Sequence, residues 1–255
     1  MSNPVILITG ATAGFGKACA EKFAAGGYDL LITGRRKERL EDLQKALEKA
    51  YGVQVLPLVF DVRDFNACSE AIEGLPERWQ NISILLNNAG LAAGLAPIDQ
   101  GALSDWETMI DTNVKGLLYM TRLVIPYLKR QPHAQIINMG STAAKDVYPN
   151  GNVYCATKHA VEALSEAMRI DLLPYGIKVT AIHPGAAETE FSMVRFKGDE
   201  TKAKNVYHGY TPLYAEDIAE VVYFCATRPA HVCINDLVIT STAQANALHT
   251  YKNEQ

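Results

Sequence analysis

The hydrophobic residues of this chain gather in short, almost continuous runs instead of alternating with polar ones. A continuous apolar run of this length indicates a strand that is covered on both faces, as in a parallel sheet. The runs predict strands at 5–9, 30–33, 53–60, 82–86, 134–139, 178–182 and 236–240. Longer stretches with helical spacing predict helices at 14–26, 37–50, 65–72, 104–129, 152–173 and 215–226.

This alternation of strands and helices predicts an α/β protein with a doubly wound parallel sheet and right-handed crossovers. Pro57 lies inside the third predicted strand. Because proline cannot donate to a central ladder, we expect that strand at the sheet edge, which fits the order 3-2-1-4-5-6. No repeat or linker interrupts the pattern, so residues 1–255 are predicted to form a single domain.

The stretch 186–212 fits neither period well, because charged residues are interspersed with Phe191, Met193, Val194 and Phe196. A connection this long in a compact domain is usually functional or mobile. It also follows the carboxyl end of a predicted strand, where doubly wound sheets bind their ligands. We predict a small helical flap over the site, with a solvated surface insertion as the alternative.

Composition narrows the functional classes. The chain has 24 Lys and Arg against 28 Asp and Glu, a net charge of −4, and no long basic run, which argues against a nucleic-acid surface. No apolar stretch approaches the roughly 18 residues that span a bilayer. The five cysteines are scattered and never in CxxC spacing, which is typical of free thiols in a reducing cytosol. We therefore expect a cytoplasmic protein. The histidines show no metal-ligand spacing, so we expect no metal site.

A glycine-rich loop joins the first predicted strand directly to a helix. It reads Thr-Gly-Ala-Thr-Ala-Gly-Phe-Gly over residues 9–16. Small residues let the backbone approach a pyrophosphate, and a helix N-terminus supplies amide donors and positive dipole. The context therefore predicts a dinucleotide site at Gly10, Thr12, Gly14, Phe15 and Gly16, against the alternative of a glycine-rich turn without a ligand.

The end of the second predicted strand indicates which dinucleotide. Enzymes that use NAD place an acid there, but this chain has Gly34 followed by Arg35 and Arg36. Two guanidinium groups suit a 2′-phosphate, so the sequence favours NADP.

Two further strand ends add candidates for the same cofactor. Asp61 is placed to accept from the adenine amino group with Val62 beside the ring, although Asp is also an ordinary helix cap. Asn88 closes the fourth predicted strand, where we expect it to brace neighbouring strands and the ribose side of the cofactor.

Candidate chemistry follows the fifth predicted strand. Ser141 ends it, and Tyr154 and Lys158 follow at the i,i+4 spacing that puts them on one helix face. A phenol is a poor base at neutral pH, but a nearby ammonium and an oxidised nicotinamide would favour its phenolate. Tyr154 would then exchange a proton with an alcohol or carbonyl, and Ser141 would hold the substrate oxygen.

On these motifs the chain resembles the NADP-using short-chain dehydrogenase/reductase family along essentially its whole length. The resemblance implies a Rossmann-like fold and a fourth catalytic residue, Asn113, which interrupts its helix to hold a water that links Lys158 to solvent. It also implies that Tyr154 and Lys158 contact the cofactor, and that Pro184, Gly185 and the backbone up to Thr189 contact the nicotinamide.

Residues 105–113, 189–192 and 194–199 are similar to the NADP-dependent 3-hydroxy acid dehydrogenases of the same family. That resemblance implies tetramers that oxidise serine, allo-threonine and 3-hydroxy acids at the 3-hydroxyl. A carboxylate in a partly closed pocket needs a cation or donors, and Arg195 and Lys197 could supply the charge. We hypothesise a substrate role for Arg195, against the alternative that these cations pair with acids in solvent.

Two other functions stay open. The stretch 186–188 departs from the pattern of that subgroup, and a wider pocket would favour a general carbonyl or ketone reductase. A protein that senses NADP without turnover would need the glycine loop but not Ser141, Tyr154 and Lys158.

Overall fold

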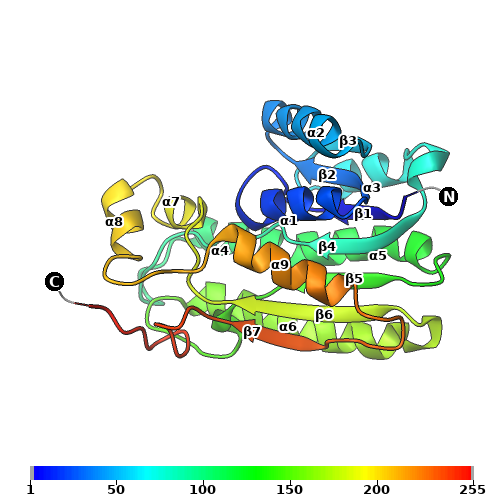
Figure 1. Cartoon of the computed structure of the whole chain (residues 1–255). Coiled ribbons are helices and arrows are strands. Elements are labelled where there is room, and N and C mark those ends of the chain that lie inside the picture. Colours follow the sequence, from blue (N-terminus) through cyan, green and yellow to red (C-terminus); the bar gives the residue numbers. More distant parts are fainter. Residues whose placement is uncertain (1–2, 254–255) are drawn as a thin grey trace.

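The computed structural model describes residues 3–253, which form one sheet of parallel strands covered by helices on both faces (Figure 1). The strand order is β3-β2-β1-β4-β5-β6-β7. The strands are β1 (Val5–Ile8), β2 (Asp29–Gly34), β3 (Val55–Val59), β4 (Ile82–Asn87), β5 (Gln135–Met139), β6 (Lys178–Pro184) and β7 (Asp236–Ile239). The predicted doubly wound fold is confirmed.

Two apolar layers hold the helices to the sheet. On one face, buried side chains of β1 and β2 pack against α1 (Gly14–Ala25), α2 (Lys37–Tyr51) and α9 (Ala215–Ala226). On the other face, the sheet packs against α3 (Phe65–Glu73), α5 (Leu117–Leu128) and α6 (Asn152–Leu172). Because both faces of the central strands are covered, those strands are almost entirely buried, and this is why their sequences show little alternation.

The edge position predicted for the third strand is also confirmed. β3 pairs only with β2, where Pro57 lies opposite Ile32. An edge strand tolerates a residue without a backbone N–H, since one side of it has no ladder to complete.

The single helix predicted at 104–129 is present but interrupted. α4 (Leu103–Ile110) runs into a π-helical segment at Asp111–Gly116 and then into α5. π segments within α-helices are frequently found at functional sites. Here the segment contains Asn113, the residue for which the family resemblance implied an interruption.

The stretch 186–212 lies beyond the carboxyl ends of the strands and carries two short helices, α7 (Phe191–Arg195) and α8 (Glu200–Asn205) (Figure 1). The C-terminal stretch, residues 240–253 after β7, runs along the same end of the molecule. It contacts the stretch 186–212, since the Asn253 N–H donates to the Gly209 carbonyl at 2.8 Å. Within residues 3–253, no helix is long and apolar enough to span a bilayer.

Candidate active site

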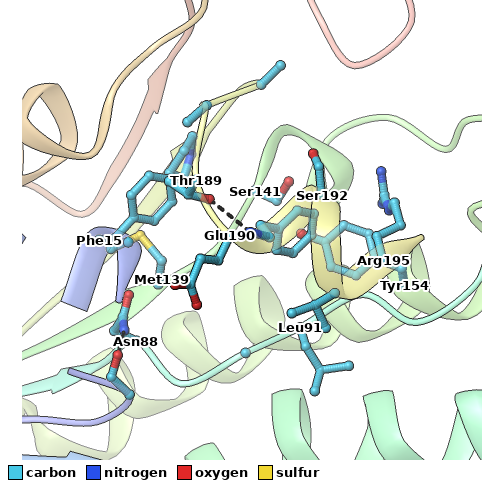
Figure 2. Close-up of a pocket in the computed structure, with 18 of the residues that line it drawn as sticks. Phe15, Asn88, Leu91, Met139, Ser141, Tyr154, Thr189, Glu190, Ser192 and Arg195 are labelled. Carbon is cyan, nitrogen blue, oxygen red and sulfur yellow. Dashed lines mark hydrogen bonds between the residues drawn. The ribbon is translucent and has the colours of Figure 1, made fainter. Parts of the chain in front are cut away.

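A cavity of about 810 Å³ opens at the carboxyl ends of the strands, between the glycine loop and α7. Nearly all the residues predicted for the site lie on its wall, although they are far apart in the sequence. They are Gly10, Thr12, Gly14, Phe15, Arg35, Arg36, Asp61, Val62, Asn88, Ser141, Tyr154, Lys158, Pro184, Gly185, Thr189 and Arg195. Figure 2 shows Phe15 and Asn88 at one side of this cavity and Tyr154 and Arg195 at the other.

The glycine loop has the close packing expected of a backbone cradle. Gly10 has a φ of +70°, and a Cβ on Gly16 would lie 2.3 Å from the Gly10 carbonyl oxygen. Gly16 therefore serves the packing of α1 against the loop, and it lies off the cavity wall. Asn88 donates from Nδ2 to the Thr9 and Gly10 carbonyls at 2.9 and 3.1 Å, so it braces β4 against β1 as predicted. This arrangement leaves the N-terminus of α1 open toward the cavity, which suits a phosphate group.

The arginines after β2 are tied to acids of the same chain. Arg36 donates to the Thr12 hydroxyl, at 2.6 Å from Nη2, and to Glu190 at 2.9 Å. Arg39, which the sequence did not single out, donates to the other Glu190 oxygen at 2.7 Å. The hydrogen bond from Arg36 lowers the pKa of Glu190, and Arg39 adds to this effect. Glu190, an acid of the predicted flap, therefore pairs with the Arg36 guanidinium that is predicted to bind the 2′-phosphate.

Asp61 lies on the cavity wall, but its carboxylate is already engaged. Arg63 donates to both carboxylate oxygens at 2.6–3.0 Å, and Arg35 lies 3.6 Å away. Burial alone would raise the pKa of Asp61, but the Arg63 hydrogen bonds and the two positive charges lower it. The predicted contact of this carboxylate with adenine therefore competes with an internal ion pair.

Tyr154 and Lys158 project from α6 into the cavity, and Ser141 meets them from the end of β5. Burial raises the pKa of the Tyr154 phenol, while the Arg195 charge and a hydrogen bond with Ser141 lower it. The Arg195 guanidinium carbon lies 5.1 Å from the centre of the Tyr154 ring, and the Lys158 ammonium lies 5.9 Å away. The sequence predicts Lys158 and an oxidised nicotinamide as the positive charges beside this phenol. Of the two side chains, Arg195 lies closer to the centre of the ring.

Lys158 is almost fully buried, and burial lowers its pKa to about 8. Its ammonium donates to the Met139 carbonyl at 2.8 Å, which points it toward the end of β5. Ser141 accepts from the Ala143 N–H at 3.1 Å through its hydroxyl oxygen, and its hydroxyl also forms the hydrogen bond with Tyr154 on the cavity wall.

Asn113 stands behind the cavity wall and supports it. Its side chain accepts from the Leu91 N–H and donates to the Leu91 carbonyl, both at 2.8 Å, and it also donates to Thr157 at 3.0 Å. Leu91 lies on the wall, so Asn113 joins the loop after β4 to α6 beside Lys158. The water that the family resemblance implies at Asn113 stays a prediction.

Arg195 and Lys197 have different surroundings. The Arg195 guanidinium donates to the Tyr148 hydroxyl and lies over the rings of Tyr154 and Phe191. Its Nε is buried and has no hydrogen-bond partner among residues 3–253. Lys197 is exposed and pairs with Asp105 at 2.9 Å, off the cavity wall. The structure therefore brings one of the two cations to the cavity and takes the other away from it.

Sequence reasoning missed the contributors at the far end of the cavity. Tyr148 lies on the wall, and so do residues of the C-terminal stretch, namely Gln244, Ala247, Leu248, Thr250 and Lys252. Gln244 accepts from the Ala186 N–H at 2.8 Å and so joins this stretch to the start of 186–212. The sequence gives one local signal for Tyr148: it is an aromatic residue that lies between Ser141 and Tyr154.

Comparison with known proteins agrees with this geometry. Residues 4–200 match the family model described as short chain dehydrogenase. The NADP-dependent 3-hydroxy acid dehydrogenase YdfG of Salmonella typhi is 48% identical over 244 residues, which cover 95% of this chain and 97% of that protein. Sulfoacetaldehyde reductase 2 of Chromohalobacter salexigens is 46% identical over 244 residues, which cover 95% of this chain and 96% of that protein. A solved structure of the closed form of serine dehydrogenase complexed with NADP+ superposes with a TM-score of 0.90, at 45% identity, and covers 98% of this chain and all of that one.

Proposed function

We propose that this chain, which belongs to the short-chain dehydrogenase family, acts on the 3-hydroxyl or 3-keto carbon of small 3-hydroxy acids. It is an NADP-dependent dehydrogenase that acts on CH–OH groups. Serine, allo-threonine and 3-hydroxypropionate-like acids are the proposed substrates. A cytoplasmic homotetramer without nucleic-acid or membrane partners stays the expectation from the sequence.

The residues present fit NADP. The cradle that Gly10, Gly16 and Asn88 form leaves room for a pyrophosphate at the α1 N-terminus, and Arg35 and Arg36 would hold the 2′-phosphate. Asp61, Val62 and Asn88 would lie along the adenosine, and Pro184, Gly185 and Thr189 would contact the nicotinamide. When bound, NADP supplies the carbon that accepts or gives up hydride.

The proton is handled by the protein's own side chains. In the oxidation direction, the Tyr154 phenolate takes the proton of the substrate hydroxyl as the carbonyl forms, and in reduction the phenol returns it. Ser141 donates its hydroxyl proton to the substrate oxygen, in place of its hydrogen bond with Tyr154, and so orients the reacting carbon. The Arg195 charge opposes the burial that raises the pKa of Tyr154, and we infer that the Lys158 ammonium, 5.9 Å from the ring centre, adds to this effect.

The position of Arg195 on the cavity wall is the observation that carries the acid preference. A carboxylate that enters a partly closed pocket needs such a charged donor to offset its desolvation. The stacking on Tyr154 and Phe191 holds the guanidinium at the reacting end of the cavity, and Tyr148 orients it. A carboxylate bound there would place the 3-carbon of a short acid near Tyr154.

Apolar residues on the same wall favour one alternative. Leu91, Leu95, Phe191 and Phe196 would suit a broader carbonyl or ketone reductase that accepts larger neutral substrates. A protein that only senses NADP is the weaker alternative, because such a protein would not need the Ser141, Tyr154 and Lys158 cluster.

The proposal is tested by monitoring the reduction of NADP through its absorbance, with 3-hydroxy acids and neutral alcohols of matched length as substrates. We expect turnover with the acids, and Arg195→Ala should lower kcat/KM for acids about 10- to 100-fold more than for neutral alcohols, as for a lost charged hydrogen bond, because neutral alcohols lose only the charge beside Tyr154. Lys197→Ala is the matched control, since it removes an exposed cation of the same segment. Faster turnover of neutral alcohols by the parent, or an equal loss for both classes, would favour the carbonyl reductase.

A further inference from the structure

A fully buried histidine lies directly beneath the proposed catalytic serine. His183 is 0% exposed, on β6 next to the end of β5. Its Nδ1 lies 3.3 Å from the backbone nitrogen of Ser141 and 3.1 Å from the Ser141 carbonyl oxygen. The ring fits there because residue 140 is glycine, where a Cβ would lie 2.3 Å from Nδ1. The imidazole therefore contacts both polar groups of the Ser141 backbone.

The other ring nitrogen faces an acid. His183 Nε2 lies 2.9 Å from Oδ1 of Asp236, at the start of β7, in a close electrostatic approach whose alignment is too poor for a hydrogen bond. The second Asp236 oxygen accepts from the Lys145 ammonium at 2.5 Å, and Lys145 also pairs with Glu162 of α6. These three residues are the charged groups that face the imidazole.

This arrangement selects one tautomer. A bare Nε2 lone pair 2.9 Å from a carboxylate oxygen would be repelled, so Nε2 carries the proton. Nδ1 is then an acceptor and takes the Ser141 N–H. With the proton on Nδ1, the ring would instead donate to the Ser141 carbonyl and leave the Ser141 N–H without a partner. Burial also lowers the pKa of His183, which favours the neutral ring at neutral pH.

We propose that His183 is a positioning residue for Ser141, and that Asp236 holds its imidazole in the orientation that accepts the Ser141 N–H. This inference rests on the proposed role of Ser141. The Ser141 hydroxyl acts within hydrogen-bond reach of the substrate oxygen, so a shift of its backbone misplaces the reacting carbon. NADP binding depends on other residues and should be unaffected.

Asp236→Ala tests the proposal, because Asp236 is half exposed at the start of a strand and its loss leaves the core intact. We expect kcat to fall about 10-fold with the KM for NADP within about 2-fold of the parent, as for a misplaced catalytic group. Asp236→Asn, whose side-chain oxygen keeps a partial negative charge facing Nε2–H, should restore part of the rate. Glu162→Gln is the control: it removes the other partner of Lys145 but leaves His183 and Asp236 facing each other, so its kcat should match the parent.

A long-range ¹H–¹⁵N spectrum of ¹⁵N-histidine-labelled protein gives a readout without turnover. His183→Asn identifies the His183 signals, which should show the Nε2–H tautomer in the parent and lose it in Asp236→Ala. An Nδ1–H tautomer in the parent, an unchanged kcat in Asp236→Ala, or an equal loss in Glu162→Gln would overturn the proposal. If the parent turned over no substrate, the proposed function would fail, while the spectrum would still decide how His183 meets Ser141.

Discussion

Replacing Lys158 with methionine should stabilise the unliganded fold while abolishing turnover. Methionine has a similar length and needs no solvation in the buried site. Burial lowers the pKa of Lys158 from 10.5 to about 8, a difference that corresponds to about 3 kcal/mol of unfavourable free energy for the charged form. The variant also leaves the Met139 carbonyl without the Lys158 donor, which costs about 1–2 kcal/mol. At pH 7 we therefore expect an unfolding free energy about 1–2 kcal/mol higher than that of the parent.

The pH dependence isolates the titration of this lysine. Below pH 8 both the folded and the unfolded parent hold the proton, so the full penalty is present. Between pH 8 and 10.5 the unfolded chain keeps a proton that the folded chain has released, so the unfolding free energy of the parent rises with pH. From pH 7 to pH 10 the parent should gain about 2.5 kcal/mol relative to Lys158→Met.

Urea unfolding at several pH values, without cofactor, measures this difference, and groups that titrate equally in both proteins cancel. Lys45→Met is the control, since Lys45 is exposed on α2 and should show no such trend. Parallel curves for the parent and Lys158→Met would refute the buried-ammonium reasoning. Measurable turnover by Lys158→Met would refute its proposed role beside Tyr154.

Three further outcomes are expected. Tyr154→Phe should lower kcat by about 10²- to 10⁴-fold, the usual contribution of a general acid or base, with NADP affinity within about 2-fold in a fluorescence titration; retained turnover would contradict the assignment. Replacing both Arg35 and Arg36 with Gln should raise the KM for NADP by at least about 10-fold and that for NAD by less than about 3-fold, and equal effects would remove the 2′-phosphate assignment. Glu190→Gln should tighten NADP binding by up to about 5-fold in the same titration, because Glu190 competes for Arg36 in a half-exposed ion pair of modest strength. Glu188→Gln is its control, and weaker binding would mean that Glu190 supports the site instead.

Much of the fold could be predicted because the sheet is buried on both faces. That burial gives the central strands nearly continuous apolar runs, and Pro57 alone was enough to place β3 at the edge. The cofactor end followed from local motifs, since residues 9–16 run directly from the end of β1 into the first turn of α1. The i,i+4 spacing likewise placed Tyr154 and Lys158 on one face of α6.

Other features depend on contacts between distant segments, which no local pattern reveals. Glu190 meets Arg36 from 154 residues away, and Gln244 meets Ala186 from 58. The π segment at Asp111–Gly116 is a single turn, too short to alter the hydrophobic period of the helix around it. The surroundings of Arg195 and Lys197 were equally hidden, because their sequence contexts are alike and only the position of α7 separates them.

Several energetically unfavourable features of this structure lie together around the cavity. A buried lysine, a buried phenol whose pKa is raised, an arginine Nε without a partner and a helix broken by a π segment all lie on or just behind the cavity wall. A buried charge and a buried donor without a partner both cost folding free energy. Such unfavourable groups are expected where the chemistry needs them, because a charge or donor that solvent cannot reach acts most strongly on a bound substrate. A stabilising substitution at any of these positions should therefore lower activity, and Lys158→Met is the variant in which both effects can be measured on one protein.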